Sequence, residues 1–175
     1  MSIQNMNKKL EQLETSFMKM QQYVKRTSNL TTDQTFYCYF NYSTIVSPDE
    51  DDTHIIIGSF HVKSISPKPM NDPIILLKIT ADAPCDFSGK FKTENQTDQP
   101  YTFLWERVTM DEVDPQTHFC FKPTQNNTLQ PNEQLSFQNF QIKVPTNESI
   151  TIEGFTYFNQ ENDGVPALNS IQLSH

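Results

Sequence analysis

The first 26 residues constrain this chain most, because their apolar residues recur at alternating spacings of three and four. Such spacing assigns the apolar residues to the a and d positions of a heptad. The a positions hold Ile3, Leu10, Phe17 and Val24, and the d positions hold Met6, Leu13 and Met20. A period of 3.5 residues predicts a helix that supercoils with another helix in a left-handed coiled coil.

The partner of this helix is expected to be another copy of the chain, since isolated helices of this length are marginal in water. Lys9 at a g position and Glu14 at the following e position have the spacing that joins neighbouring chains in parallel. Phe17 needs more room at an a position than a two-stranded seam provides. We therefore expect a parallel homo-oligomer, with a trimer favoured over a dimer.

The chain is expected to divide into a helix, a linker and one domain. Thr27 is a poor residue for the next d position, and the polar residues that follow compete for backbone hydrogen bonds. We assign residues 1–28 to the coiled coil, 29–34 to a linker and 35–175 to a β domain. A chain of 175 residues has room for one domain plus such an appendage.

Residues 35–175 show alternating patterns, short spacing between turns, and no second helical period. The strands expected from these patterns are 35–46, 53–66, 74–81, 86–93, 100–109, 116–122, 133–144, 149–158 and 167–174, with a loop at 159–166. With 13 Phe and 6 Tyr to fill a core, this predicts a mainly β chain, an antiparallel β-sandwich of jelly-roll or immunoglobulin-like type.

Two strands show a switch in which face carries the apolar residues. In 133–144 the switch falls between Gln138 and Asn139, which predicts a β-bulge. In 149–158 it falls at Gly154, after Ile152 and before Phe155, and predicts a second shift of register.

The net charge of −8 is distributed unevenly. The first 26 residues carry +3, from Lys8, Lys9, Lys19, Lys25 and Arg26 against Glu11 and Glu14, so the remainder carries −11. An acidic body argues against a nucleic-acid partner, because phosphate binding requires clustered Lys and Arg. The basic helix is interpreted as a solvated coiled-coil flank, the alternative being a contact with an acidic surface.

One strand offers a candidate ligand-binding face. The alternation in 101–107 places on one side Tyr101, Phe103, Trp105 and Arg107. Aromatic residues that end in Arg suit a sugar-stacking platform, and they also suit a core strand with Arg at its wet end. We expect the core role, and keep contact of Tyr101, Trp105 and Arg107 with a ligand as the alternative.

No residue set predicts a chemical reaction, a metal or a cofactor, so we expect no enzyme. His118 and Cys120 share a face but lack a second ligand pair, and His54 and His61 are expected on opposite faces of their strand. The acids at 49–52 lack the spacing of a calcium loop. No glycine-rich phosphate loop or nucleophile elbow occurs.

The cysteines bear on the compartment. Cys38, Cys85 and Cys120 are odd in number, without CxxC spacing. The sequence has no apolar signal-peptide core and no apolar run long enough for a membrane span. We expect a protein made in the cytoplasm with reduced thiols and no membrane contact.

The plan of the chain resembles that of the small baseplate, fibre and receptor-binding proteins of tailed bacteriophages. The shared features are a short N-terminal coiled coil at 3–24, a polar linker, and strands rich in Asn, Gln, Thr and aromatics after residue 34. The resemblance implies a homotrimeric structural or adsorption protein of a phage or prophage virion. Its partners would be other virion proteins or a host surface saccharide. The alternative is a cellular carbohydrate- or protein-binding sandwich made multivalent by its helix.

Overall fold

The computed structural model describes residues 35–49, 52–93, 103–109, 113–159 and 161–174. The predicted coiled coil and linker, and also Tyr101, lie outside the described residues. Within the described part the regular structure is β strand without a helix, and the named strands pair antiparallel. The prediction of a mainly β, antiparallel chain is confirmed.

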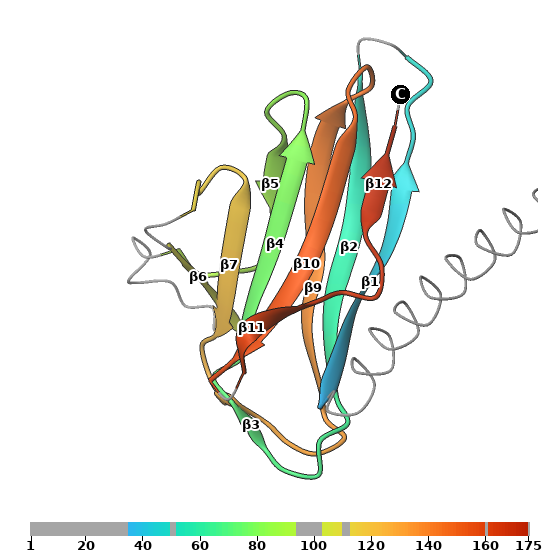
Figure 1. Cartoon of the computed structure of the whole chain (residues 1–175). Helices are drawn as coiled ribbons and strands as arrows, with labels where there is room; N and C mark the ends of the chain where they lie inside the picture. The colour runs from blue at the N-terminus through green and yellow to red at the C-terminus, as the bar shows by residue number, and fades with distance from the viewer. Residues whose placement is uncertain (1–34, 50–51, 94–102, 110–112, 160, 175) are drawn as a thin grey trace, which may run out of the picture. The chain divides into compact units, whose positions relative to one another are not determined.

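The strands form two main sheets (Figure 1). The first sheet runs in the order β1 (Phe36–Ile45), β2 (Thr53–Ser64), β9 (Gln134–Pro145) and β5 (Asp86–Ser88). The second runs in the order β11 (Glu161–Pro166), β10 (Ile150–Phe158), β4 (Ile74–Ala81), β7 (His118–Pro123) and β6 (Trp105–Val108), with β12 (Ile171–Leu173) also paired to β10. A small sheet pairs β3 (Met70–Asn71) with β8 (Thr128–Leu129).

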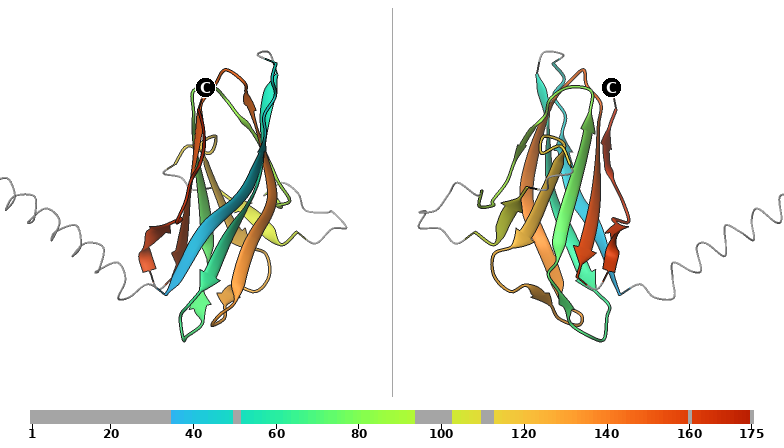
Figure 2. Two further views of the ribbon diagram at one scale, coloured as in Figure 1. Left: turned by 90° about the vertical axis from the view of Figure 1, so that its right-hand side faces the viewer. Right: turned by 60° about the vertical axis from the view of Figure 1, so that its left-hand side comes forward.

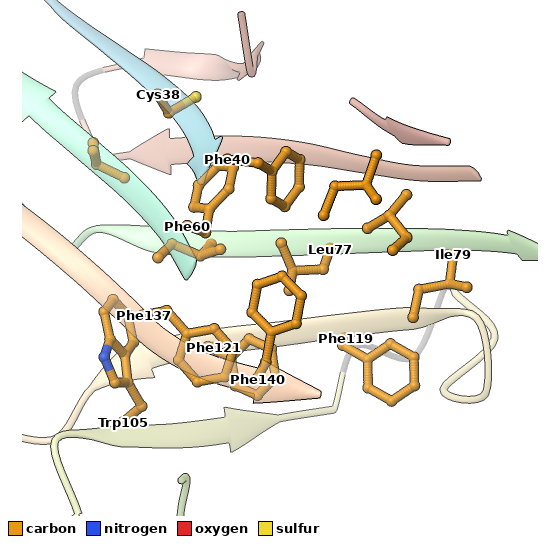
Figure 3. Close-up of a cluster of buried hydrophobic side chains, with 14 of the residues drawn as sticks. Cys38, Phe40, Phe60, Leu77, Ile79, Trp105, Phe119, Phe121, Phe137 and Phe140 are labelled. Atoms are coloured by element: carbon orange, nitrogen blue, oxygen red, sulfur yellow. The ribbon is translucent and has the colours of Figure 1, made fainter. Parts of the chain in front are cut away.

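The two main sheets lie face to face as two layers (Figure 2). Aromatic rings from both layers meet in the core between them (Figure 3). Phe121 of β7 stacks on Phe137 of β9 with ring centroids 4.3 Å apart, and Phe36 of β1 meets Phe158 of β10 edge-on at 4.8 Å. Each fully buried Phe contributes about 1.5–3 kcal/mol, so a chain of modest apolar content still builds a core.

The β-bulge predicted in β9 is confirmed. Gln138 and Asn139 together lie opposite Ser59 of β2, where the register shifts by one residue. Asn139 has φ 58°, in the left-handed region, and its N–H donates to Ser59 Oγ at 3.2 Å. The extra residue lets Phe137 and Phe140 both point into the core.

The second predicted register shift is wrong. β10 pairs with β4 without a shift from Ile150 to Tyr157. Gly154 itself faces the core, where an added Cβ would lie 2.2 Å from Cε2 of Phe60, so the glycine leaves room for that ring. Phe155 lies on the outer face and is half-buried. In the sequence, aromatic residues on the outer face therefore looked like a switch in which side of the strand faces the core, although no switch occurs.

The predicted strand 86–93 is shortened to β5, and among the described residues 103–109 of the predicted strand 100–109 only β6 is a strand; β5 and β6 belong to different sheets. The chain crosses between the layers after β5. On the way, Lys92 N–H donates to Trp105 O and Arg107 N–H donates to Lys92 O, each at 2.8 Å. These bonds hold the crossing segment against β6. Lys92, one of the residues that would lengthen β5, is therefore paired with β6 instead of β9.

The C-terminal segment also differs from expectation, because the predicted loop 159–166 contains β11. This strand pairs Pro166 with Phe155 and Val165 with Thr156 of β10. The chain then reaches the edge of the other sheet, where Leu168 N–H donates to the carbonyl of Cys38 at 2.8 Å. The predicted strand 167–174 is reduced to β12.

Candidate ligand-binding surface

Trp105 lies in the core rather than on an open platform, with 3% of its surface exposed. Its indole N–H donates to the carbonyl of Ser136 at 3.1 Å, and its ring meets Phe137 edge-on at 5.6 Å. The bond to Ser136 joins β6 of one sheet to β9 of the other. A buried indole with a satisfied N–H is the ordinary state of a core Trp.

Arg107 lines a separate groove of about 650 Å³ at the β5–β7 end of the two layers. Its guanidinium lies 4.6 Å from the centre of the Phe119 ring, and Nη2 donates to the carbonyl of Pro115. Cys85 lines the same groove. Burial raises the pKa of the Cys85 thiol, so it stays protonated and is not an activated nucleophile.

The other polar candidates remain apart from one another. His118 Nδ1 lies 2.9 Å from the hydroxyl of Thr117, and Cys120 is buried. Within the described ranges, no three His, Cys, Asp or Glu side chains are close enough to hold a metal, and no helix is long and apolar enough to cross a membrane. Cys38, Cys85 and Cys120 form no disulfide.

The most suggestive surface lies on the outer face of β1, β2 and β9. Tyr37 and Tyr39 share this face because they are two residues apart on one strand. Their rings stack with centroids 6.1 Å apart, and the Tyr39 ring lies 5.0 Å from that of His61, its partner on β2. We call Tyr37, Tyr39 and His61 the aromatic ladder. All three are half-buried, so each keeps part of its surface accessible.

A hydrogen-bonded ring of polar side chains borders the aromatic ladder. Gln134 Nε2 approaches His61 Nδ1 at 3.2 Å and Ser136 Oγ at 3.3 Å, while Ser136 Oγ lies 2.8 Å from His61 Nδ1. An amide NH₂ can only donate, so Nδ1 accepts and the ring proton sits on Nε2. Burial lowers the pKa of His61, which favours this neutral imidazole.

His61 and Ser136 also have the spacing of a base and a nucleophile. Gln134 donates to the same nitrogen that faces the serine hydroxyl. Nδ1 has a single lone pair, so the Gln134 amide competes with the serine hydroxyl for it. The arrangement suits recognition by fixed donors and acceptors better than proton transfer.

A groove of about 570 Å³ lies beside β9 and includes Ser136, the neighbour of His61. Its lining residues are Lys90, Phe103, Leu104, Trp105, Ser136, Gln138 and Asn139. Ser136 belongs to both surfaces, with its hydroxyl on the ladder side and its carbonyl held by Trp105. The groove is mostly apolar and includes the amide side chains of Gln138 and Asn139.

Sequence reasoning placed its ligand-contact candidates on 101–107 and missed the aromatic ladder. The available signal was the pair Tyr37 and Tyr39 on the polar face of β1. Recognition of His61 and Ser136 as their neighbours required the pairing of β1 with β2 and of β2 with β9. Comparisons of the chain with models of protein families and with curated proteins found no match.

Proposed function

We propose that the protein is a non-enzymatic adsorption protein whose β domain binds a neutral or basic saccharide on the aromatic ladder. The observation that carries this proposal is the stack of Tyr37, Tyr39 and His61 on an open sheet face. Tyr side chains supply rigid contact area at low cost in conformational entropy. Gln134 and Ser136 add fixed polar groups of the kind that orient hydroxyl-rich ligands.

Charge supports the choice of saccharide. Residues after the first 26 carry −11, and an oligomer multiplies this charge. Such a body repels nucleic acids and anionic polymers at low ionic strength. A neutral or basic glycan avoids this repulsion.

For the fold of the β domain, we infer the immunoglobulin-like type rather than the jelly roll. The order β1-β2-β9-β5 corresponds to A-B-E-D of a constant-type immunoglobulin domain, and β11-β10-β4 to G-F-C. In this scheme β6, β7 and β8 are an insertion between D and E. The insertion extends the second sheet beyond strand C.

The proposal for assembly rests on the sequence. The heptad residues Ile3 to Val24 would form a parallel homo-oligomer, with a trimer favoured. Several β domains could then contact one surface at once, so weak individual contacts would add up to tighter binding. Light scattering of the full chain should give a multiple of the 20.3 kDa chain mass, and Leu10→Lys with Leu13→Lys should give monomers. A monomeric wild type at micromolar concentration would contradict this part.

The particle in which the protein acts is likewise proposed from the plan of the chain. In the phage or prophage interpretation it is a virion component, and mass spectrometry of purified virions should detect it. In the alternative interpretation it is a cellular carbohydrate- or protein-binding module, absent from such particles. The location of its gene within or outside a tail-gene cluster separates the two.

A glycan array probed with the full chain tests the saccharide proposal. The wild type should bind a subset of neutral or basic glycans. Tyr39→Ala removes the ring that contacts both Tyr37 and His61, and it should weaken binding at least tenfold, about 1.4 kcal/mol.

Tyr42→Ala is the matched control, because Tyr42 is an exposed Tyr on the same strand that takes no part in the ladder. It should bind as the wild type does. Absence of binding by a folded wild type would refute the proposal. Equal binding by Tyr39→Ala would place the saccharide elsewhere.

A further inference from the structure

The outer edge of β1 is closed over only half its length. β1 is the last strand of its sheet and pairs with β2 alone (Figure 1). Near the start of β1, the carbonyl of Cys38 accepts from Leu168 N–H. At Phe40 the side chain of Asn169 bonds both the N–H and the C=O. The backbone groups of these even-numbered residues therefore point away from β2.

The second half of this edge is open. By the alternation of an antiparallel strand, the N–H and C=O of Tyr42 and Thr44 also point away from β2. No described residue hydrogen-bonds them. A strand edge without a charged residue, Pro or bulge is a template for another strand, and 42–46 contains none of these.

Exposed apolar side chains gather at the same place. Of the six large hydrophobic side chains exposed among the described residues, three lie on this open half of the edge: Tyr42 at 42%, Ile45 at 55% and Val46 at 62%. Scattered exposure would need no explanation, whereas a cluster beside unpaired backbone indicates an interaction site.

The charge beyond the open edge is negative. Asp49 and Asp52 are exposed in the turn that follows β1. The hydroxyl of Ser47 donates to Asp52 at 2.6 Å, which lowers the pKa of this carboxyl and keeps it ionised. The segment 42–49 contains no Lys or Arg. A second copy of this edge would bring no positive charge to these carboxylates.

We propose that the edge 42–46 docks an extended peptide segment of a partner protein, added as an antiparallel strand with apolar or β-branched side chains and a basic N-terminal end. In the antiparallel orientation the N-terminal end of the peptide lies beside Asp49, where positive charge is complementary. The contact is short compared with stable interfaces, so binding is weak and reversible. This surface is separate from the aromatic ladder and goes beyond the proposed function.

Fluorescence anisotropy of two labelled peptides, KKTVTIT and EETVTIT, with the full chain tests the proposal. The wild type should bind KKTVTIT more tightly than EETVTIT. Thr44→Pro removes an outward N–H without removing a bond to β2, and should weaken KKTVTIT at least tenfold. Asp49→Lys should weaken KKTVTIT about two- to fivefold, the size of an exposed ion pair, and strengthen EETVTIT.

Thr44→Val is the matched control, because it keeps the N–H and should bind as the wild type does. Equal binding by Thr44→Pro and Thr44→Val would exclude strand addition. If circular dichroism shows that Thr44→Pro does not fold, the test rests on Asp49→Lys. This variant should then prefer EETVTIT to KKTVTIT more than the wild type does, and an unchanged preference overturns the proposal. If neither peptide binds and the wild type self-associates more than Thr44→Pro, the occupant is a second copy and the proposal is wrong.

Discussion

The side chain of Asn169 holds both outward groups of the Phe40 backbone. Its Oδ1 accepts from Phe40 N–H at 2.8 Å, and its Nδ2 donates to Phe40 C=O at 3.0 Å. One amide side chain thus replaces a neighbouring strand for one residue pair. Through this contact, the segment after β11 is tied to the edge of the opposite sheet.

Asn169→Ala should destabilise the domain by about 1–3 kcal/mol, because it leaves part-buried backbone groups of Phe40 without partners. Urea unfolding of the full chain measures the change. Ser170→Ala is the neighbouring control and should stay within about 0.5 kcal/mol. A loss of the same small size for both variants would mean that water replaces the Asn169 amide at no cost.

The strands that could be predicted from sequence are those with a clear alternation of their own. The prediction 35–46 corresponds to β1, and 74–81 coincides with β4. The bulge at Gln138 and Asn139 was predictable because the apolar pattern itself shifts by one residue. The prediction at Gly154 was wrong, because the apolar pattern does not show that a glycine occupies a position on the core face of the strand.

The contacts that shape the candidate surfaces were not predictable, because they join residues far apart in the chain. Asn169 and Phe40 are separated by 129 residues, and Ser136 and His61 by 75. The two Tyr residues of the aromatic ladder were visible as a pair on a polar face. Their partner His61 depends on the register of β1 with β2, which no local signal sets.

Trp105→Ala should destabilise the domain by about 3–5 kcal/mol, as expected for truncation of a buried aromatic residue. Trp105→Phe keeps most of the packing but leaves the carbonyl of Ser136 without the indole donor, and should cost less than Trp105→Ala. Thermal or urea unfolding of the two variants shows which one loses more stability. The fluorescence of the wild type should be blue-shifted and resistant to iodide; a quenchable Trp105 would contradict its burial.

Gly154→Ala should destabilise the domain by about 1–3 kcal/mol through overpacking, since the new Cβ would lie 2.2 Å from Cε2 of Phe60 and 2.8 Å from Cζ of Phe40. Pairing Gly154→Ala with Phe60→Leu should give a loss smaller than the sum of the two single losses, because the smaller side chain makes room for the methyl group. Urea unfolding of the two single variants and the double variant measures this coupling. Strictly additive losses would show that the Phe60 ring is not what opposes a side chain at position 154.

Acidification should weaken the domain through His61. Burial lowers the pKa of this imidazole below its ordinary value of 6.5, so between the folded and unfolded pKa values the unfolded chain binds more protons. The contribution of His61 to stability is therefore complete above pH 6.5 and is lost as pH falls through the folded pKa. The lowered pKa of Asp52 acts below 3.8, outside this window.

Unfolding measured between pH 5 and pH 8 on the wild type and on His61→Gln should show that the stability advantage of the wild type shrinks on acidification. Glycan binding should weaken over the same range, because protonated Nδ1 can no longer accept from Gln134 and Ser136. A proton NMR titration of the His61 imidazole decides the point directly: a midpoint at or above 6.5 would rule out a neutral imidazole stabilised by burial.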